Sequence, residues 1–269
     1  MSKSASKSTE TSVLEAADAL QRAESRQTQI PPLVARLGQG NVAAAYEVQA
    51  ELTSRRIAAG GRLVGRKIGL TSNAVQQQLG VNEPDFGALF VDMEVEQGGS
   101  VDSKLLIQPR IEAEVALVLE RDLERRDTTM SELMRAVAFA APALEIVDSR
   151  IEDWKISIVD TIADNGSSAR FVLGNSIRRL TDVDLLTCGM VMTKNGNVVS
   201  VGSGAACLGH PLKAALWLVR RLAANENGAH LRAGDVILTG ALGPMVSATA
   251  GEEYEARISD LGSVKVRFT

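Results

Sequence analysis

The sequence predicts an α+β protein in which helices gather near the N-terminus and a β-rich region follows them. Two observations predict this class. Residues 11–60 place apolar side chains at helical intervals, whereas from Arg62 onward short apolar and β-branched runs alternate with Gly, Pro, Asp and Asn. A third observation narrows the class: strand-like and helix-like runs do not alternate regularly, which argues against a TIM barrel or a Rossmann domain.

Composition and charge restrict the classes of partner. The chain has 269 residues, 45% hydrophobic and 23% charged, so it can bury a full core. A net charge of -4 without any run of Lys or Arg argues against nucleic-acid binding. The polar start lacks the apolar core of a signal peptide, and nowhere do about 18 apolar residues run unbroken. We therefore expect a cytoplasmic protein that binds small molecules or copies of itself, without nucleic-acid or membrane partners.

The first 60 residues divide into two segments. Residues 1–10 are polar, and we expect them to form a disordered leader. Residues 12–27 and 43–61 each carry apolar side chains at helical spacing, and the second run ends at Gly60 and Gly61. The sequence thus predicts a leader over 1–10, a helical N-terminal segment over 11–60 and a catalytic β-rich domain over 61–269.

The β-rich domain contains strand-like runs and three helical patterns. Asn-Gly within KNGN, residues 194–197, predicts a tight hairpin between two strands, and DLG at 260–262 predicts a second one. Helical patterns cover residues 71–80, 130–140 and 210–225. The expected strands lie in residues 62–70, 87–95, 110–120, 142–150, 168–174, 189–204, 234–240 and 253–268.

Two glutamates interrupt one of the most apolar strands. Glu112 and Glu114 lie on one face of the strand at residues 110–120, because successive side chains point to opposite faces. A face exposed to solvent is the simplest explanation, since charged residues are rarely buried without a partner. A third acid, Glu145, lies between Leu144 and Ile146 in another apolar run. The alternative is that the three carboxylates supply oxygen ligands to a divalent cation such as Mg²⁺. The spacing of the three glutamates alone does not decide between exposure to solvent and metal binding.

Several longer motifs carry a family resemblance. They are RIEAEVA at 110–116, ALEIVDSRIEDW at 143–154, IADNGSSARFVLG at 162–174, LGHPLKAALWLVRRLA at 208–223 and the stretch from AGDVILTGALGPMV to KVRF at 233–268. In this order they resemble the 2-keto-4-pentenoate hydratases of the fumarylacetoacetate hydrolase superfamily. The likeness runs from about Gly61 to the C-terminus. It implies a fumarylacetoacetate hydrolase-like fold, a mixed β-roll around a central pocket.

The resemblance also implies a set of site residues. Glu112, Glu114 and Glu145 correspond to the ligands of Mg²⁺ or Mn²⁺ in this superfamily. Lys67, in KIGL, and Asp85, in PDFG, correspond to residues that line the same pocket. Our hypothesis is that this pair transfers protons, with the pKa of Lys67 lowered by its surroundings; alternatively, Lys67 is an electrostatic anchor for the substrate.

Other residues are expected to have smaller roles. Ser167 corresponds to a substrate-binding serine, although Ser168 adjoins it. We expect Gly240 and Gly243 to allow a close approach of the backbone to the pocket. Cys188 and Cys207 have no metal-like spacing and are expected to be reduced and buried. His210 and His230 are expected to be structural or exposed. Since hydrolases of the superfamily use a histidine that precedes these positions, cleavage of a C–C bond is disfavoured.

The implied activity is a metal-dependent hydration. Such hydratases convert 2-hydroxypenta-2,4-dienoate to 4-hydroxy-2-oxopentanoate in the bacterial meta-cleavage degradation of aromatic compounds. A sister enzyme, 4-oxalocrotonate decarboxylase, uses the same glutamates and lysine and is the nearest alternative. A further alternative is a non-catalytic partner of such a decarboxylase. The resemblance also implies a homo-oligomer, and a complex with a decarboxylase of the same pathway.

Overall fold

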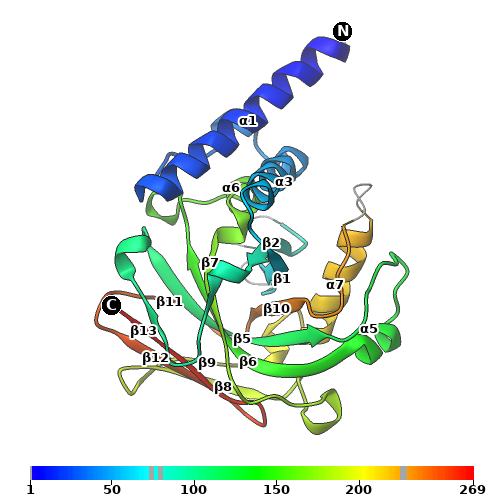
Figure 1. The fold of residues 1–269 in the computed structure, drawn as a ribbon, viewed down its shortest axis with the longest axis vertical. Helices are drawn as coiled ribbons and strands as arrows, with labels where there is room; N and C mark the ends of the chain where they lie inside the picture. The colour runs from blue at the N-terminus through cyan, green and yellow to red at the C-terminus, as the bar shows by residue number, and fades with distance from the viewer. Residues whose placement is uncertain (1, 73–75, 78–80, 225–228) are drawn as a thin grey trace.

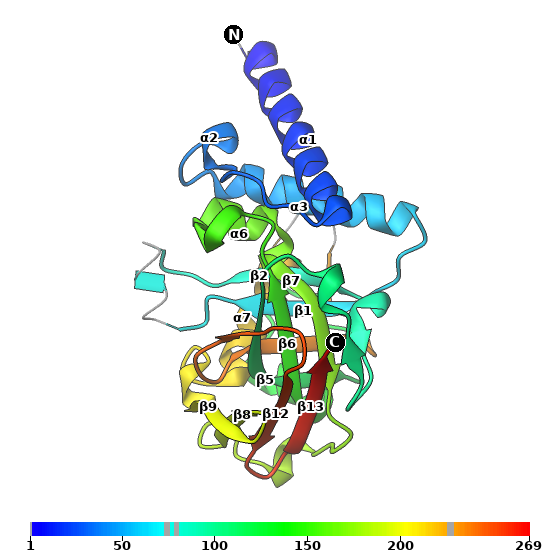
Figure 2. The same cartoon turned by 90° about the vertical axis from the view of Figure 1, so that its left-hand side faces the viewer.

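The computed structural model describes residues 2–269 apart from 73–75, 78–80 and 225–228 (Figure 1). Two β-sheets form the lower part of the molecule in this view, and the N-terminal helices lie above them (Figures 1 and 2). Among the described residues, no helix is both long enough and apolar enough to cross a membrane. The α+β class and the mixed β-roll expected from the sequence are confirmed by this arrangement.

The N-terminal helices pack on one another and on a later helix. Their buried side chains, such as Leu20 and Val48, share an apolar cluster with Val159 and Ile162. The first helix begins at Ser2, within the segment 1–10 that the sequence predicts as a disordered leader; that division of the chain stays a prediction. No Gly or Pro interrupts that helix, and adding a residue to an existing helix costs little. The elements involved are α1 (Ser2–Arg26), α2 (Val34–Leu37), α3 (Val42–Ala58) and α6 (Ile158–Ala163).

The larger sheet has the order β2-β1-β10-β5-β6-β7-β3, with β11 paired to β5. Its centre is the long antiparallel pair β5 and β6, the two green strands that cross the middle of Figure 1. The strands are β1 (Leu63–Gly69), β2 (Asp85–Phe90), β3 (Glu94–Val95), β5 (Pro109–Leu119), β6 (Val137–Asp148), β7 (Ser168–Leu173), β10 (Val236–Ala241) and β11 (Val246–Ser247).

The smaller sheet has the order β4-β13-β12-β8-β9. Both predicted hairpins belong to it and are confirmed. Asn195 and Gly196 link β8 to β9 with φ values of 50° and 81°, as a tight turn requires, and residues 259–261 link β12 to β13. The strands are β4 (Ser100–Val101), β8 (Gly189–Lys194), β9 (Asn197–Ser203), β12 (Glu253–Ile258) and β13 (Gly262–Phe268).

The predicted helices of the β-rich domain had different outcomes. The helix expected at 210–225 is confirmed as α7 (Pro211–Ala223). The one expected at 130–140 is wrong in its second half, because α5 (Met130–Ala136) gives way to β6 at Val137, whose apolar residues pair with β5. Most of the segment 71–80 lies outside the described residues. Short 3₁₀ turns complete the chain: η1 (Val91–Met93), η2 (Ser103–Leu105), η3 (Glu152–Trp154), η4 (Asn165–Ser167), η5 (Leu180–Asp182) and η6 (Gly204–Ala206).

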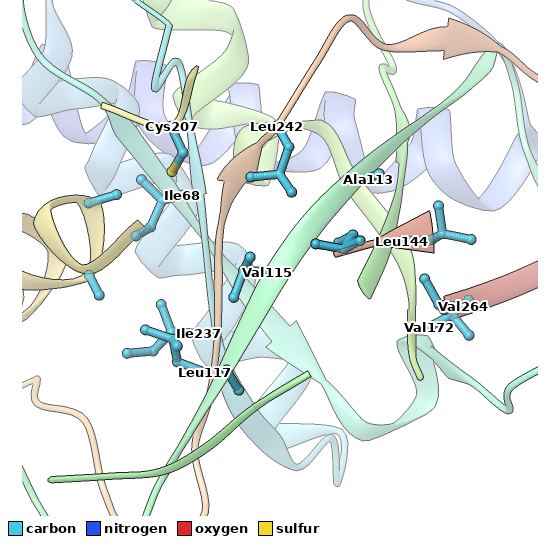
Figure 3. Packing of buried hydrophobic residues seen from close by; sticks show 14 of the residues in the cluster. Ile68, Ala113, Val115, Leu117, Leu144, Val172, Cys207, Ile237, Leu242 and Val264 are labelled. Carbon is cyan, nitrogen blue, oxygen red and sulfur yellow. The ribbon is translucent and has the colours of Figure 1, made fainter. Parts of the chain in front are cut away.

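The main core lies against one face of β5. Ala113, Val115 and Leu117 point into it, together with Leu144 of β6 and Ile237 of β10 (Figure 3). These odd-numbered positions of β5 are almost fully buried. The opposite face of β5 therefore carries the even-numbered positions, and these include Glu112 and Glu114.

Candidate active site

Three glutamates meet where β5 lies beside β6. Glu112 and Glu145 are opposite each other in the antiparallel register, and Glu114 follows Glu112 on the same face. One carboxylate oxygen from each of them lies within 4.8 Å of the other two. Glu114 and Glu145 are fully buried and Glu112 is partly buried. A solvent-facing role for these acids, which we call the glutamate cluster, is therefore wrong.

Most oxygens of the buried glutamates lack hydrogen bonds within the described chain. The backbone N–H of Gly240 donates to Oε2 of Glu114 over 2.7 Å, which is the close backbone approach expected at this glycine. Oε1 of Glu114 and both oxygens of Glu145 have no hydrogen-bond partner. Buried carboxylates normally accept hydrogen bonds or coordinate a metal. The glutamate cluster therefore offers the free oxygen donors that Mg²⁺ or Mn²⁺ prefers.

A single lysine approaches the glutamate cluster from β1. The ammonium nitrogen of Lys67 lies 3.2 Å from Oε2 of Glu145, and both side chains are buried. The distance makes this an ion pair, although its angles are not those of a hydrogen bond. Lys67 thus brings one positive charge to a group of buried acids.

Asp85 is a fourth acid at the site. It begins β2 opposite Gly69, at the end of β1, and its side chain is almost fully buried. The hydroxyl of Thr161, on α6, donates to Oδ2 of Asp85 over 3.2 Å. Oδ1 has no hydrogen-bond partner among the residues that the structure describes, so one oxygen of Asp85 is fixed in place and the other is free to accept a proton.

Burial and mutual repulsion set the protonation of this group. Burial, followed by the negative charge of Glu145, raises the pKa of Glu112 to about 7 and the pKa of Glu114 well above its ordinary value. Burial also raises the pKa of Asp85. Burial disfavours the charged form of Lys67, but its attraction to the four carboxylates outweighs this effect and raises the pKa. In the metal-free site the pKa of Lys67 is therefore raised rather than lowered, which favours the charged ammonium.

Ser167 lies in η4, a turn with an unusual backbone. Asn165, Gly166 and Ser167 have consecutive φ values of 56°, 61° and 56°, all in the left-handed region. The side chain of Asn165 holds the turn by accepting from the backbone N–H of Ala88 over 2.7 Å and donating to its carbonyl over 3.0 Å. A Cβ on Gly166 would lie only 3.0 Å from Cε of Lys67. Only glycine therefore lets the turn pass so close to the lysine.

A buried ion pair anchors the start of this turn to the end of β6. The guanidinium of Arg150 donates from Nε to the carboxylate of Asp164 and from an NH2 group to its backbone carbonyl, the latter over 2.6 Å. The other guanidinium nitrogen donates to the carbonyl of Asp148 over 2.7 Å. Since η4 begins at Asn165, this pair fixes the position from which Ser167 extends.

The catalytic candidates share one cavity of about 370 Å³. Its polar lining comprises Lys67, Asp85, Glu112, Thr161 and Ser167, together with Thr71 and Ser72. The hydroxyl of Ser167 is buried and has no hydrogen-bond partner among the described residues. Its neighbour in sequence, Ser168, lines a different cavity, between α1, α3 and η4. The remaining lining is mainly apolar and includes Leu70, Val147, Trp154, Ile156, Ala206, Ala241, Pro244 and Met245.

Comparisons with known proteins bear on this site. The family model described as "Fumarylacetoacetate (FAA) hydrolase C-terminal" matches residues 88–269. The chain belongs to the fumarylacetoacetate hydrolase family. Within this family, it is 50% identical over 250 residues to a 2-keto-4-pentenoate hydratase of Paraburkholderia phymatum, covering 93% of this chain and 95% of the relative. It is 53% identical over 239 residues to 2-keto-4-pentenoate hydratase 2 of Dechloromonas aromatica, covering 89% and 90% of the two chains. The likeness places it among the 2-keto-4-pentenoate hydratases.

A solved structure of this family agrees in fold over nearly the whole chain. It is the 4-oxalocrotonate decarboxylase of Pseudomonas putida G7, complexed with magnesium and adipate. The TM-score is 0.91 at 39% sequence identity, and the match covers 96% of this chain and 97% of the decarboxylase. A related protein of the same fold thus binds a divalent metal and a carboxylic acid.

Sequence reasoning missed several parts of this family member's site. The hydroxyl of Thr161 and the amide of Asn165 each contact a segment that is distant in sequence. The helix that carries Thr161 was also missed, although its Ser157 and Asp160 form a capping box that signals a helix start.

The histidines and cysteines lie outside the cavity lining. His210 caps α7 by accepting from the N–H of Leu212, and His230 lies 3.6 Å from Glu124. Cys188 and Cys207 are free and buried, as expected.

Proposed function

We propose that this member of the fumarylacetoacetate hydrolase family hydrates 2-hydroxypenta-2,4-dienoate to 4-hydroxy-2-oxopentanoate, as in the meta-cleavage degradation of aromatic compounds. The observation that carries the proposal is the glutamate cluster with unpartnered oxygens beside the buried Lys67. The identity of about half of all residues to named 2-keto-4-pentenoate hydratases supports the choice of substrate, a small 2-oxo acid.

Glu112, Glu114 and Glu145 would hold Mg²⁺ or Mn²⁺. Their oxygen donors, their mutual distances and their free lone pairs fit a hard divalent cation. When bound, such a cation would supply Lewis-acid stabilisation of the negative charge that develops on the substrate. Magnesium in the related decarboxylase supports this choice.

Asp85 and Lys67 are assigned different roles in the proton transfers. In the first step the 2-hydroxyl loses a proton and C5 gains one, which gives an unsaturated 2-oxo acid. Asp85 accepts the enol proton through Oδ1, which has no other partner, while Thr161 holds Oδ2. Lys67 is charged and neutralises the negative charge that develops on the 2-oxygen.

The second step is the conjugate addition of water, whose oxygen bonds to C4 while a proton is added to C3. The buried hydroxyl of Ser167 lines the cavity without a partner, and it is assigned to bind the substrate carboxylate. The rigid turn η4 and the ion pair between Arg150 and Asp164 keep this hydroxyl oriented. This positioning lowers the entropic cost of bringing the substrate into reacting geometry.

Decarboxylation is the second candidate, because the fold is shared with a 4-oxalocrotonate decarboxylase at a TM-score of 0.91. The chain is 39% identical to that decarboxylase but 50% identical to the Paraburkholderia hydratase, which favours hydration. Both reactions pass through a stabilised enolate, so the glutamate cluster serves either. Two expectations about assembly stay predictions. One is a homo-oligomer, and the other is a complex with a decarboxylase in which the chain is an active or inactive partner.

Product identification separates these candidates. Enzymatically generated 2-hydroxypenta-2,4-dienoate and, separately, 2-oxohex-3-enedioate are incubated with the protein and Mg²⁺, and the products are identified by mass spectrometry. We expect 4-hydroxy-2-oxopentanoate from the first compound and no CO₂ from the second. Release of CO₂ without hydration would assign the chain to the decarboxylases, and inertness toward both would support the non-catalytic partner.

A further inference from the structure

A buried glutamine of the N-terminal helices contacts both elements that carry the pair formed by Asp85 and Thr161. We propose that Gln49, on α3, is a positioning residue that holds Asp85 and Thr161 in the geometry needed for proton transfer. Gln49 is not a lining residue of the cavity that contains Lys67, and it acts through the backbone of the segments beside it. The inference rests on the proton-accepting role proposed for Asp85, and it extends the site to a helix that precedes the residues matched by the family model.

The amide of Gln49 joins two segments that are far apart in the sequence. Its Nε2 donates to the carbonyl of Phe86 over 2.8 Å and to the carbonyl of Ile162 over 2.9 Å. Phe86 directly follows Asp85 in β2, and Ile162 directly follows Thr161 in α6. Gln49 is only 5% exposed, so water competes little for these two hydrogen bonds. Gln49 therefore fixes the distance between the backbone segments that carry the acid and the hydroxyl.

The carbonyl of Phe86 lies on an edge of the larger sheet that no described strand covers. β2 is at the end of the strand order and pairs with β1. Along its other edge, side-chain amides take the place of a neighbouring strand: Gln49 donates to Phe86, and Asn165 pairs with the N–H and the carbonyl of Ala88. Phe86 and Ala88 are two residues apart, so their backbone groups point to the same edge. Removal of the Gln49 amide would leave the buried carbonyl of Phe86 without this donor.

A second contact from α3 holds the side chain of Phe86. The ring of Tyr46 stacks on the ring of Phe86, with 4.8 Å between the centroids and 23° between the planes. Tyr46 and Gln49 are three residues apart on α3, so they lie on the same face of the helix. Figure 2 shows α3 and α6 together above β2. The helix α3 thus holds the residue after Asp85 by both its side chain and its backbone carbonyl.

A displacement of Phe86 would move Asp85 relative to Thr161. Asp85 is the first residue of β2 and pairs with Gly69, the last residue of β1, so the strand pairing restrains it mainly on its C-terminal side. The hydroxyl of Thr161 reaches Oδ2 of Asp85 over 3.2 Å, which is already at the long end for a hydrogen bond. A misplacement of about 1 Å at a reacting group can slow a reaction by about 10²-fold. We therefore expect Gln49 to affect the chemical step more than the binding of substrate or metal.

Replacing Gln49 by methionine removes both donors and nearly keeps the length of the side chain. At saturating Mg²⁺, we expect kcat for 2-hydroxypenta-2,4-dienoate to fall at least about tenfold. KM, and the Mn²⁺ affinity measured by calorimetry, should stay within about twofold of the wild-type values. A wild-type kcat in Gln49→Met would overturn the inference.

Val48→Ala is the matched control for a loss of packing around α3. Val48 is the preceding residue of the helix, is fully buried, and belongs to the apolar cluster that α3 shares with α1 and α6. At a temperature where circular dichroism shows both variants to be folded, Val48→Ala should keep the wild-type kcat; a loss equal to that of Gln49→Met would assign the effect to the fold alone. Gln49→Asn is the second variant if Gln49→Met does not fold. It keeps a buried amide but is one methylene too short to reach both carbonyls, so the same fall in kcat is expected.

A double-mutant cycle with Asp85→Asn tests whether Gln49 acts through Asp85. We expect Gln49→Met to lower kcat at least about tenfold in the wild type and less than about twofold in the Asp85→Asn background, because effects within one catalytic unit are not additive. An equal factor in both backgrounds would show that Gln49 acts independently of Asp85, contrary to the inference. The cycle also separates the two proposals. A wild-type kcat in Asp85→Asn alone would refute the role of Asp85 and the inference with it, whereas a wild-type kcat in Gln49→Met alone would refute only the positioning role.

Discussion

Replacing Lys67 by methionine removes the one positive charge among the described residues that line the cavity, and it leaves the side-chain volume nearly unchanged. At the 3.2 Å separation between the ammonium and the carboxylate of Glu145, the attraction is about 5 kcal/mol for an effective dielectric constant of about 20. Loss of one partner of a buried pair costs about 3–5 kcal/mol in the free energy of unfolding. We therefore expect Lys67→Met to destabilise the metal-free protein by about this amount and to leave Mn²⁺ binding intact, because a repelling cation has been removed.

The same variant tests the role of Lys67 in turnover. We expect hydration to slow by about 10²–10⁴-fold, which corresponds to about 3–5 kcal/mol in the activation barrier. The rate is followed as the loss of the ultraviolet absorbance of the dienol, at saturating metal and at a temperature where the variant is folded. Lys104→Met, at an exposed lysine, is the control and should have the wild-type rate. A wild-type rate in Lys67→Met would refute both a proton-transfer role and an electrostatic role for this residue.

Three further predictions concern the neighbouring acids. Glu145→Gln should lower Mn²⁺ affinity at least about tenfold in calorimetry, and unchanged affinity would place the metal elsewhere. Because the pKa of Glu112 is raised from 4.5 to about 7 in the folded state, the folded metal-free protein binds more protons than the unfolded chain between these values. Its stability in urea denaturation should therefore fall as pH rises through this window, by up to about 3 kcal/mol, and a flat profile would contradict the assignment. Asp164→Asn leaves the buried guanidinium of Arg150 without its anion and should cost about 3–5 kcal/mol in the same assay; a loss under about 1 kcal/mol would show that the pair does not stabilise the fold.

Local patterns predicted the parts of the fold that depend on neighbouring residues. The Asn195-Gly196 turn and the helix α7 follow from turn chemistry and from a period of 3.6 residues, both of which are visible in a short window. The run at 137–140 is apolar enough for either a helix or a strand, and pairing with β5 decides for the strand. The start of α1 at Ser2 depends on helix propagation from residues that follow it.

The sequence predicted several residues of the candidate site but not the contacts between them. Alternation along β5 placed Glu112 and Glu114 on one face, but only the family resemblance added Lys67 and Asp85. The raised pKa of Lys67 could not be predicted, because it depends on four carboxylates that three strands bring together. The hydrogen bond from Thr161 to Asp85 joins residues 76 positions apart. Contacts of this kind are set by packing and leave no periodic signal in the sequence.

Hydration should depend on a metal ion that the glutamate cluster binds. The most direct measurement is the rate of hydration of 2-hydroxypenta-2,4-dienoate by protein stripped with EDTA, as Mg²⁺ is added back, for the wild type and Glu145→Gln in parallel. We expect the stripped wild type to be inactive and to regain its rate with Mg²⁺, whereas the variant should not recover at the same concentrations. A full rate in EDTA, or equal recovery of both proteins, would contradict this expectation.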